Sequence, residues 1–233
     1  MKYFLTVISI LLLSTAVLGQ NRREKKVIDA YLQVSNQKMG SEFMPLMKWN
    51  QDSIGYYIYG RMKGMTKNNW RRFLNKIERV SGLHFYLVEN NKDAQILLYF
   101  GKVKEYFKKE RIKNKFKVDS KVVVWSDRDY DYSFGLRRTS FCIDKDEIHN
   151  FNQIKYMIKH EFLKSLGLFG KLDGSTCILS EEYSQKKKNI SLRSVDKACI
   201  AIHYSDNIKS EMSKAEVKMA IKALDLEPLL KRR

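Results

Sequence analysis

Apolar residues recur at three- and four-residue intervals in several stretches of the chain, which is typical of amphipathic helices. The clearest case is residues 66–80, where Trp70, Phe73 and Ile77 share one face and basic residues occupy the other. Gly82 follows this stretch and is a helix-ending residue. Similar spacing predicts further helices over residues 23–39, 147–168, 191–204 and 213–224.

Short runs of β-branched and aromatic residues accompany these helices in the first half of the chain and predict strands. The runs are residues 54–59, 83–88, 94–100, 121–125 and 140–144. The predicted order is therefore one strand, one helix and several more strands, followed by helices in the second half. This order indicates an α+β domain: a twisted mixed sheet of about five strands with a backing helix, then a small helical C-terminal part.

The beginning of the chain differs from the rest. Lys2 is followed by an apolar run, and small residues precede Gln20, which is the pattern of a secretory signal peptide cleaved after Gly19. An uncleaved N-terminal anchor is the alternative. We expect a secreted or periplasmic protein that keeps no stable membrane span after cleavage. The expected parts are a signal peptide (1–19), a basic N-terminal segment (20–44), the main domain (45–226) and a basic tail (227–233).

The charge balance is strongly basic, with 44 Lys and Arg residues against 26 Asp and Glu residues and a net charge of +18. Such a charge attracts polyanions, but the basic residues form many short groups and no nucleic-acid-binding module is recognisable. We therefore expect no sequence-specific nucleic-acid binding. A protein, a peptide and an anionic surface polymer remain open as partners. Polyanion binding would require the lysines to cluster on one face of the fold.

The three cysteines are too few and too scattered for a disulfide scaffold, and none forms a C-x-x-C pair. Two arrangements remain open. Cys177 and Cys199 could form a bridge that leaves Cys142 as a thiol, or all three could be small buried side chains.

One predicted helix in the second half carries a pattern with chemical meaning. His160 and Glu161 match the start of a zincin helix, in which two histidines four residues apart bind zinc and a glutamate activates water. Metzincins add a glycine three residues after the second histidine and then a third histidine, and Gly167 matches that glycine. Lys164 and Gly170 occupy the positions of the second and third histidines.

These residues and the order of elements resemble metzincins. The chain resembles more closely a family of uncharacterised exported bacterial proteins, many of them described as lipoproteins, whose zinc-binding helix is degenerate. The matching segments are Glu161–Leu168, Leu192–Asp196, Tyr204–Asp206 and Glu211–Ser213. The resemblance implies a metzincin-like fold over roughly residues 49–224, with Ile178 or Leu179 at the position of the methionine turn.

Two functions are compatible with this resemblance. The first is an exported, non-catalytic protein that needs no cofactor and binds a protein, a peptide or a surface polymer in the former substrate cleft. The alternative is a divergent zinc-dependent metallopeptidase with His160 as a metal ligand and Glu161 as the general base. Candidates for its further ligands are His84, His149, His203 and Asp173. The missing histidines favour the first function. In that case we expect the Glu161 carboxylate either to pair with Lys164, three residues later, or to accept hydrogen bonds from backbone N–H groups.

Overall fold

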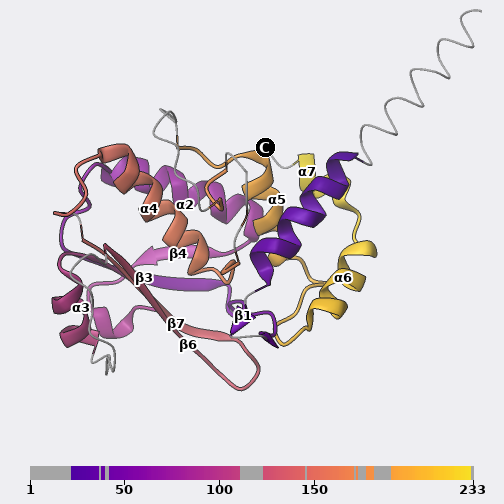
Figure 1. Cartoon of the computed structure of the whole chain (residues 1–233), viewed down its shortest axis with the longest axis horizontal. Helices are drawn as coiled ribbons and strands as arrows, with labels where there is room; N and C mark the ends of the chain where they lie inside the picture. Colours follow the sequence, from indigo (N-terminus) through magenta and orange to yellow (C-terminus); the bar gives the residue numbers. More distant parts are fainter. Residues whose placement is uncertain are drawn as a thin grey trace, which may run out of the picture.

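The computed structural model describes residues 22–36, 38–39, 42–110, 123–144, 146–170, 172, 177–180 and 190–231. The signal peptide expected over residues 1–19 and the candidate ligand Asp173 lie outside these residues. Figure 1 shows a sheet covered by helices and, beside it, a helical part formed largely by the C-terminal half of the chain.

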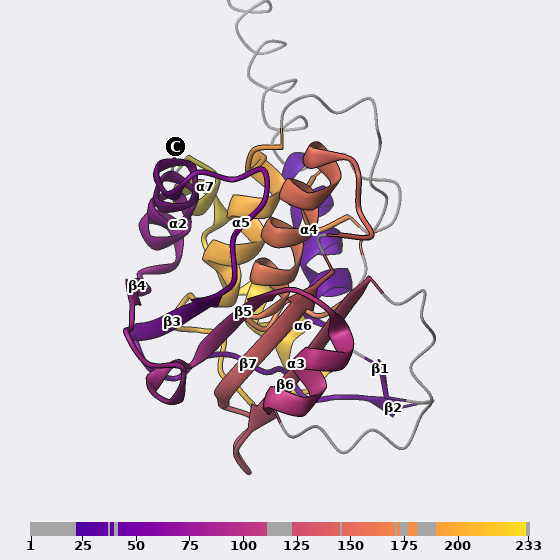
Figure 2. The same ribbon diagram turned by 90° about the vertical axis from the view of Figure 1, so that its left-hand side faces the viewer.

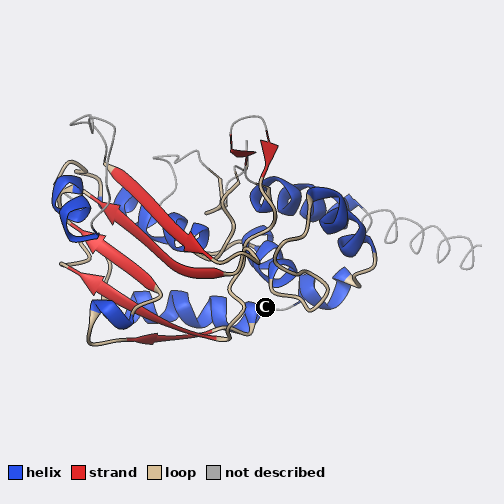
Figure 3. Cartoon of the chain, turned by 90° about the horizontal axis from the view of Figure 1, so that it is seen from below, coloured by secondary structure: helices blue, strands red, loops and turns tan. Residues whose placement is uncertain are grey.

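Five strands form one mixed sheet, so the α+β class predicted from the sequence is confirmed. The strands are β3 Ser53–Tyr59, β4 His84–Leu87, β5 Ile96–Phe100, β6 Val124–Tyr130 and β7 Leu136–Ile143. Figure 3 shows the strands side by side. Their hydrogen-bonded order is β4-β3-β5-β7-β6. All neighbouring strands are parallel except β6 and β7, which form an antiparallel hairpin. Within the described residues, β6 is therefore an edge strand.

The hairpin of β6 and β7 is longer than the sequence pattern predicts. We expected strands over residues 121–125 and 140–144, whereas β6 continues to Tyr130 and β7 begins at Leu136. The added part of β6 lies at the edge of the sheet and is polar, so it lacks the alternation of apolar residues that marks a half-buried strand. The turn is closed by Asp131, whose carboxylate accepts hydrogen bonds from two backbone N–H groups.

Helix α2, Lys67–Ser81, forms where the pattern predicts it. The hydroxyl of Thr66 accepts a hydrogen bond from a backbone N–H of the first turn, and Gly82 closes the other end in the left-handed conformation. Trp70 and Phe73 are buried on the face that packs against the sheet. The sequence alone therefore gives both the position and the orientation of this helix.

Helix α4, Phe151–Lys164, lies on the same side of the sheet as α2 (Figure 2). The ring centre of Phe162 lies 4.9 Å from that of Trp70 on α2 and 5.3 Å from that of Phe85 on β4. Both contacts are edge to face. We expected the helix to begin at residue 147. It begins later because the side chain of Asn150 accepts hydrogen bonds from two first-turn N–H groups and caps the helix.

The opposite side of the sheet is covered by α3, Val103–Glu110 (Figures 1 and 2). Tyr106 of this helix is completely buried, and its hydroxyl lies 2.6 Å from the hydroxyl of Ser140 on β7. Residues of β7 therefore alternate between the α3 side and the α4 side of the sheet. The other short elements are β1 Lys38–Met39, β2 Glu42–Phe43 and the 3₁₀ helix η1 Asn91–Asp93.

The three cysteines are buried thiols. The bridge between Cys177 and Cys199 is not formed, and the second of the two arrangements considered above is the observed one. Burial raises the pKa of the Cys142 thiol to about 12 and raises that of Cys199 well above its usual value. These thiols are therefore neutral and serve as small core side chains.

The helical part consists of α5 Ser194–His203, α6 Lys214–Lys222 and α7 Leu226–Lys231. Helix α6 opens with a capping box, in which Ser213 and Glu216 each bond the backbone N–H of the other. None of the helices in the described part of the chain combines the length and hydropathy that a bilayer crossing requires.

A helix over residues 22–35 packs against α5. The hydroxyl of Tyr31 lies 3.1 Å from Nδ1 of His203, and both side chains are fully buried. Val34 also belongs to the main hydrophobic core. The basic N-terminal segment that we drew over residues 20–44 therefore shares one core with the rest of the domain.

Candidate functional site

Of the two arrangements expected for Glu161, the last turn of α4 carries the ion pair with Lys164. One carboxylate oxygen of Glu161, Oε1, lies 3.6 Å from Nζ of Lys164. Glu161 is only 7% exposed, and its second oxygen, Oε2, is buried without a hydrogen-bond partner. Burying a carboxylate oxygen without a hydrogen-bond donor costs free energy. This position therefore suits a ligand that donates a hydrogen bond to the oxygen.

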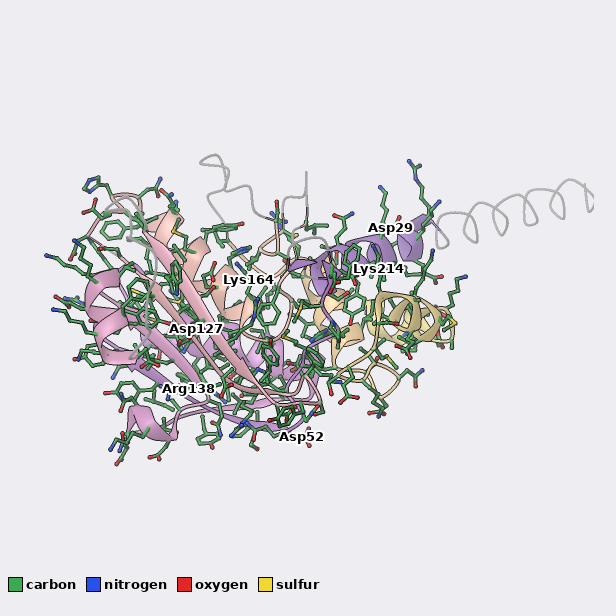
Figure 4. All side chains as sticks on the ribbon, turned by 60° about the horizontal axis from the view of Figure 1, so that its bottom comes forward. Asp29, Asp52, Asp127, Arg138, Lys164 and Lys214 are labelled. Carbon is green, nitrogen blue, oxygen red and sulfur yellow. The ribbon has the colours of Figure 1, made fainter. Side chains whose placement is uncertain are left out.

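A cavity of about 310 Å³ lies between this end of α4 and the β6–β7 hairpin. We call it the hairpin cavity. Its lining residues are Ser126, Asp127, Arg128, Thr139, Ser140, Phe141, Glu161, Lys164, Ser165 and Phe169. Figure 4 labels two of them, Lys164 at the end of α4 and Asp127 on β6. The cavity is thus formed by segments that are far apart in the sequence.

The strand register explains which hairpin side chains turn toward α4. Arg128 of β6 pairs with Thr139 of β7, and side chains of paired residues lie on the same side of a sheet. The hydroxyl of Thr139 is buried and, like Glu161 Oε2, has no hydrogen-bond partner. The guanidinium of Arg128 lies 4.2 Å from the ring centre of Phe169, and burial lowers the pKa of Arg128. The cavity therefore combines two cations with two unpartnered oxygen atoms.

His160 is oriented away from this ion pair, toward the loop before α5. Its Nδ1 lies 2.7 Å from the carbonyl oxygen of Ile178, and its ring stacks on Tyr156 at 5.4 Å. The residue is 9% exposed. Its observed contacts therefore hold the segment around Ile178 against α4.

The same segment is held from the other side by Asp196, which is completely buried in α5. The Asp196 carboxylate accepts hydrogen bonds from the backbone N–H groups of Ile178, Leu179 and Arg193 at 2.8 to 3.2 Å. Burial raises the pKa of Asp196, and these hydrogen bonds oppose the rise. In the sequence, Asp196 stood out only as part of a family pattern, and this role was not predicted. Its place in the first turn of a helix was the available signal.

A catalytic zinc site requires three protein ligands and an open position for water, and we tested whether the residues here fit one. Lys164 cannot replace the second histidine while its ammonium is paired with Glu161, because a cation opposes a dication. At the third position, the N–H of Gly170 donates to the carbonyl of Val34. A Cβ at Gly170 would lie 1.9 Å from the carbonyl oxygen of Gln33, so no larger side chain fits there.

The three candidate histidines that the structure describes have other surroundings. His84 lies beside Glu78 at 3.5 Å, His149 is exposed before α4, and His203 is fully buried near Met47. No group of three or more His, Cys, Asp or Glu side chains in the described ranges is arranged to hold a metal ion. The residues that the structure describes therefore do not fit the zinc site of a metzincin.

Residues 24–223 match a protein family described as "Protein of unknown function (DUF2927)". The chain belongs to the DUF2927 family. The matched region of this DUF2927 protein begins inside the helix over residues 22–35 and ends just after α6, so it includes the hairpin cavity and Asp196. No curated protein matches the sequence.

Proposed function

We propose that this protein is an exported, non-catalytic member of the DUF2927 family that binds an extended peptide in the hairpin cavity. The observation that carries the proposal is the environment of Glu161. One of its oxygens pairs with Lys164, and the other is buried without a partner. A ligand that donates a hydrogen bond to this oxygen relieves an unsatisfied buried acceptor, and Thr139 offers a second such position.

A peptide suits this site because its backbone carries both hydrogen-bond donors and acceptors. Strand β6 is the outermost strand of the sheet in the described residues, and an extended peptide can add to such an edge through backbone hydrogen bonds. Arg128 and Lys164 provide cationic partners for a carboxylate. We therefore expect a bound peptide to place an acidic side chain or its C-terminal carboxylate in the cavity.

A metzincin-like scaffold is part of the proposal. It is supported by the order β3, α2, β4, β5, α3, β6 and β7 before α4, and by the position of α4 against the sheet. It is also supported by the contact between His160 and Ile178, since the resemblance places the methionine turn at Ile178 or Leu179. Export to the periplasm or the medium is proposed from the signal-peptide pattern of Met1–Gly19.

Peptide binding can be tested by narrowing the cavity at its rim. Ser126 lies on the cavity side of β6 and is exposed, so Ser126→Tyr would fill the cavity without disturbing the core. Peptides selected from a random displayed library on the mature protein should bind Ser126→Tyr about tenfold more weakly, measured by fluorescence anisotropy. Asp129→Tyr is the matched control, because Asp129 is exposed on the same strand but does not line the cavity.

Equal binding of the selected peptides to both variants would place the peptide site elsewhere and refute the proposal. So would a library that yields no enriched peptide. Thermal unfolding of both variants verifies that each remains folded.

The absence of catalysis has a separate test. We expect mature protein incubated with zinc and then dialysed to retain much less than one zinc ion per chain by elemental analysis, and to leave casein intact, because the donor set does not fit zinc. Stoichiometric zinc, together with casein hydrolysis that Glu161→Gln abolishes, would instead establish the divergent metallopeptidase.

A further inference from the structure

A second cavity, of about 270 Å³, lies between α2 and α4 and shares no lining residue with the hairpin cavity. We call it the α2–α4 groove. Its lining residues are Met65, Asn69, Arg72, Phe73, Lys76, Asn152, Lys155, Lys159, Ile190, Ser191 and Leu192. The segment 190–192, which leads into α5, forms its third side.

The charge of the groove has one sign. Arg72 and Lys76 line it from α2, and Lys155 and Lys159 line it from α4, while no Asp or Glu is among the lining residues. Each pair is spaced four residues apart, so both of its side chains lie on one face of their helix. No carboxylate of the described residues forms an ion pair with any of the four. The fold thus brings these basic residues together on one surface, although their scattered positions in the sequence did not reveal it.

Lys159 is held inside the groove and does not extend into solvent. Its ammonium donates a hydrogen bond to the carbonyl of Ile190 and lies 5.4 Å from the ring centre of Phe73. Burial, followed by the charges of Lys76 and Lys155, lowers the pKa of Lys159 to about 8. Like charges held this close repel one another, and a bound anion would offset the repulsion.

The remaining polar groups favour an oxyanion. Asn69, Asn152 and Ser191 contribute side chains that can donate hydrogen bonds, beside the guanidinium of Arg72 and the three ammonium groups. Several donors converging in a small volume match the tetrahedral oxygens of a phosphate or sulfate better than the planar oxygens of one carboxylate.

We infer that the α2–α4 groove is a binding site for a multiply charged phosphate group, separate from the peptide site proposed above. The phosphate could belong to a soluble compound or to the headgroup of a lipid. Both sources share the same chemistry, and the experiment distinguishes them.

Binding is measured with sodium pyrophosphate and sodium sulfate by isothermal titration calorimetry at constant ionic strength. Lys159→Met keeps a flexible apolar stem but removes the charge. It should weaken the binding of both anions about tenfold. The double variant Arg72→Gln/Lys76→Gln alters only exposed side chains of α2 and should weaken them at least as much. Lys218→Gln, which removes an exposed charge from α6, should change affinity by less than about twofold.

A second readout separates this site from general attraction to a basic protein. Sulfate does not titrate near neutral pH, so any proton taken up when it binds must be taken up by a group of the protein. Because a bound anion raises the pKa of Lys159, sulfate should bind with proton uptake near pH 8, and its affinity should fall about tenfold between about pH 7 and pH 9. Lys159→Met should lose the uptake.

Co-sedimentation with vesicles containing phosphatidic acid assigns the source of the phosphate. Sedimentation that Lys159→Met abolishes indicates a lipid headgroup, whereas anion binding without sedimentation indicates a soluble compound, and both support the inference. An equal loss of anion affinity in all the variants, the control Lys218→Gln included, would overturn the inference. So would sulfate binding without proton uptake.

Discussion

Replacing Gly170 by alanine is expected to lower the free energy of unfolding by about 3 kcal/mol, measured by urea denaturation of the mature protein. A Cβ at this position would lie 1.9 Å from the carbonyl oxygen of Gln33 and 2.8 Å from that of Asn36. Both atoms belong to the backbone, which cannot move aside as a side chain can. The alanine would therefore push the helix over residues 22–35 away from the loop after α4.

The shift would also break a hydrogen bond. The N–H of Gly170 donates to the carbonyl of Val34, one of the last carbonyls of that helix, at 2.7 Å. Gly82→Ala is the matched control: Gly82 has a positive φ of 78°, but a Cβ there meets no atom within 4 Å. We expect that control to cost about 1 kcal/mol, from backbone conformation alone. Similar costs for the two variants would contradict the close approach at Gly170.

The lack of space for a side chain at Gly170 also affects the position that the zincin resemblance assigns to the third histidine. Lys164→His would restore the second histidine at a half-buried position, but Gly170→His would meet the same backbone atoms as the alanine. The packing of the helix over residues 22–35 therefore closes the position that the resemblance assigns to the third histidine.

The parts of the fold that could be predicted are those with local signals. Helix α2 was predicted correctly because Thr66, the spacing of its apolar residues and Gly82 all lie within or beside it. The polar half of β6 was missed, because an edge strand with solvent on its sides carries no apolar alternation. The start of α4 was placed too early, because Asn150 was not recognised as its cap.

The candidate site divides in the same way. The pair of Glu161 and Lys164 follows from a three-residue spacing on one helix and was one of the two arrangements expected for Glu161. Arg128, Thr139 and Phe169 were missed, because they join the pair only through the register of β6 and β7 and the turn after α4. The spacing of residues in the sequence does not predict these long-range contacts.

Acidification is expected to destabilise the protein through His203. This residue is completely buried, its Nε2 lies 3.1 Å from the carbonyl oxygen of Met47, and its Nδ1 lies 3.1 Å from the hydroxyl of Tyr31. Because a carbonyl can only accept, Nε2 carries the ring N–H, and in the neutral ring Nδ1 accepts a hydrogen bond from the Tyr31 hydroxyl. Burial, together with the nearby charge of Lys48, lowers the pKa of His203 to about 3.

In the unfolded chain the same histidine has a pKa of about 6.5. Between these two values the unfolded state binds a proton that the folded state does not, so stability falls as the pH falls. The contribution of His203 between about pH 7.5 and about pH 4.5 is a loss of about 2.7 kcal/mol. Urea denaturation at a series of pH values measures it.

The comparison with His203→Gln isolates this contribution, because glutamine can donate to Met47 and accept from Tyr31 but does not titrate. Asp196 acts in the opposite direction, since its raised pKa makes its own contribution fall as the pH rises, but both proteins contain it. The test compares how the free energies of unfolding of the two proteins change with pH, so a lower starting stability of the variant does not alter its outcome. We expect the stability difference between the two proteins to shrink or reverse toward low pH. A difference that stays constant would show that His203 takes up a proton as readily in the folded protein as in the unfolded chain, contrary to the expectation.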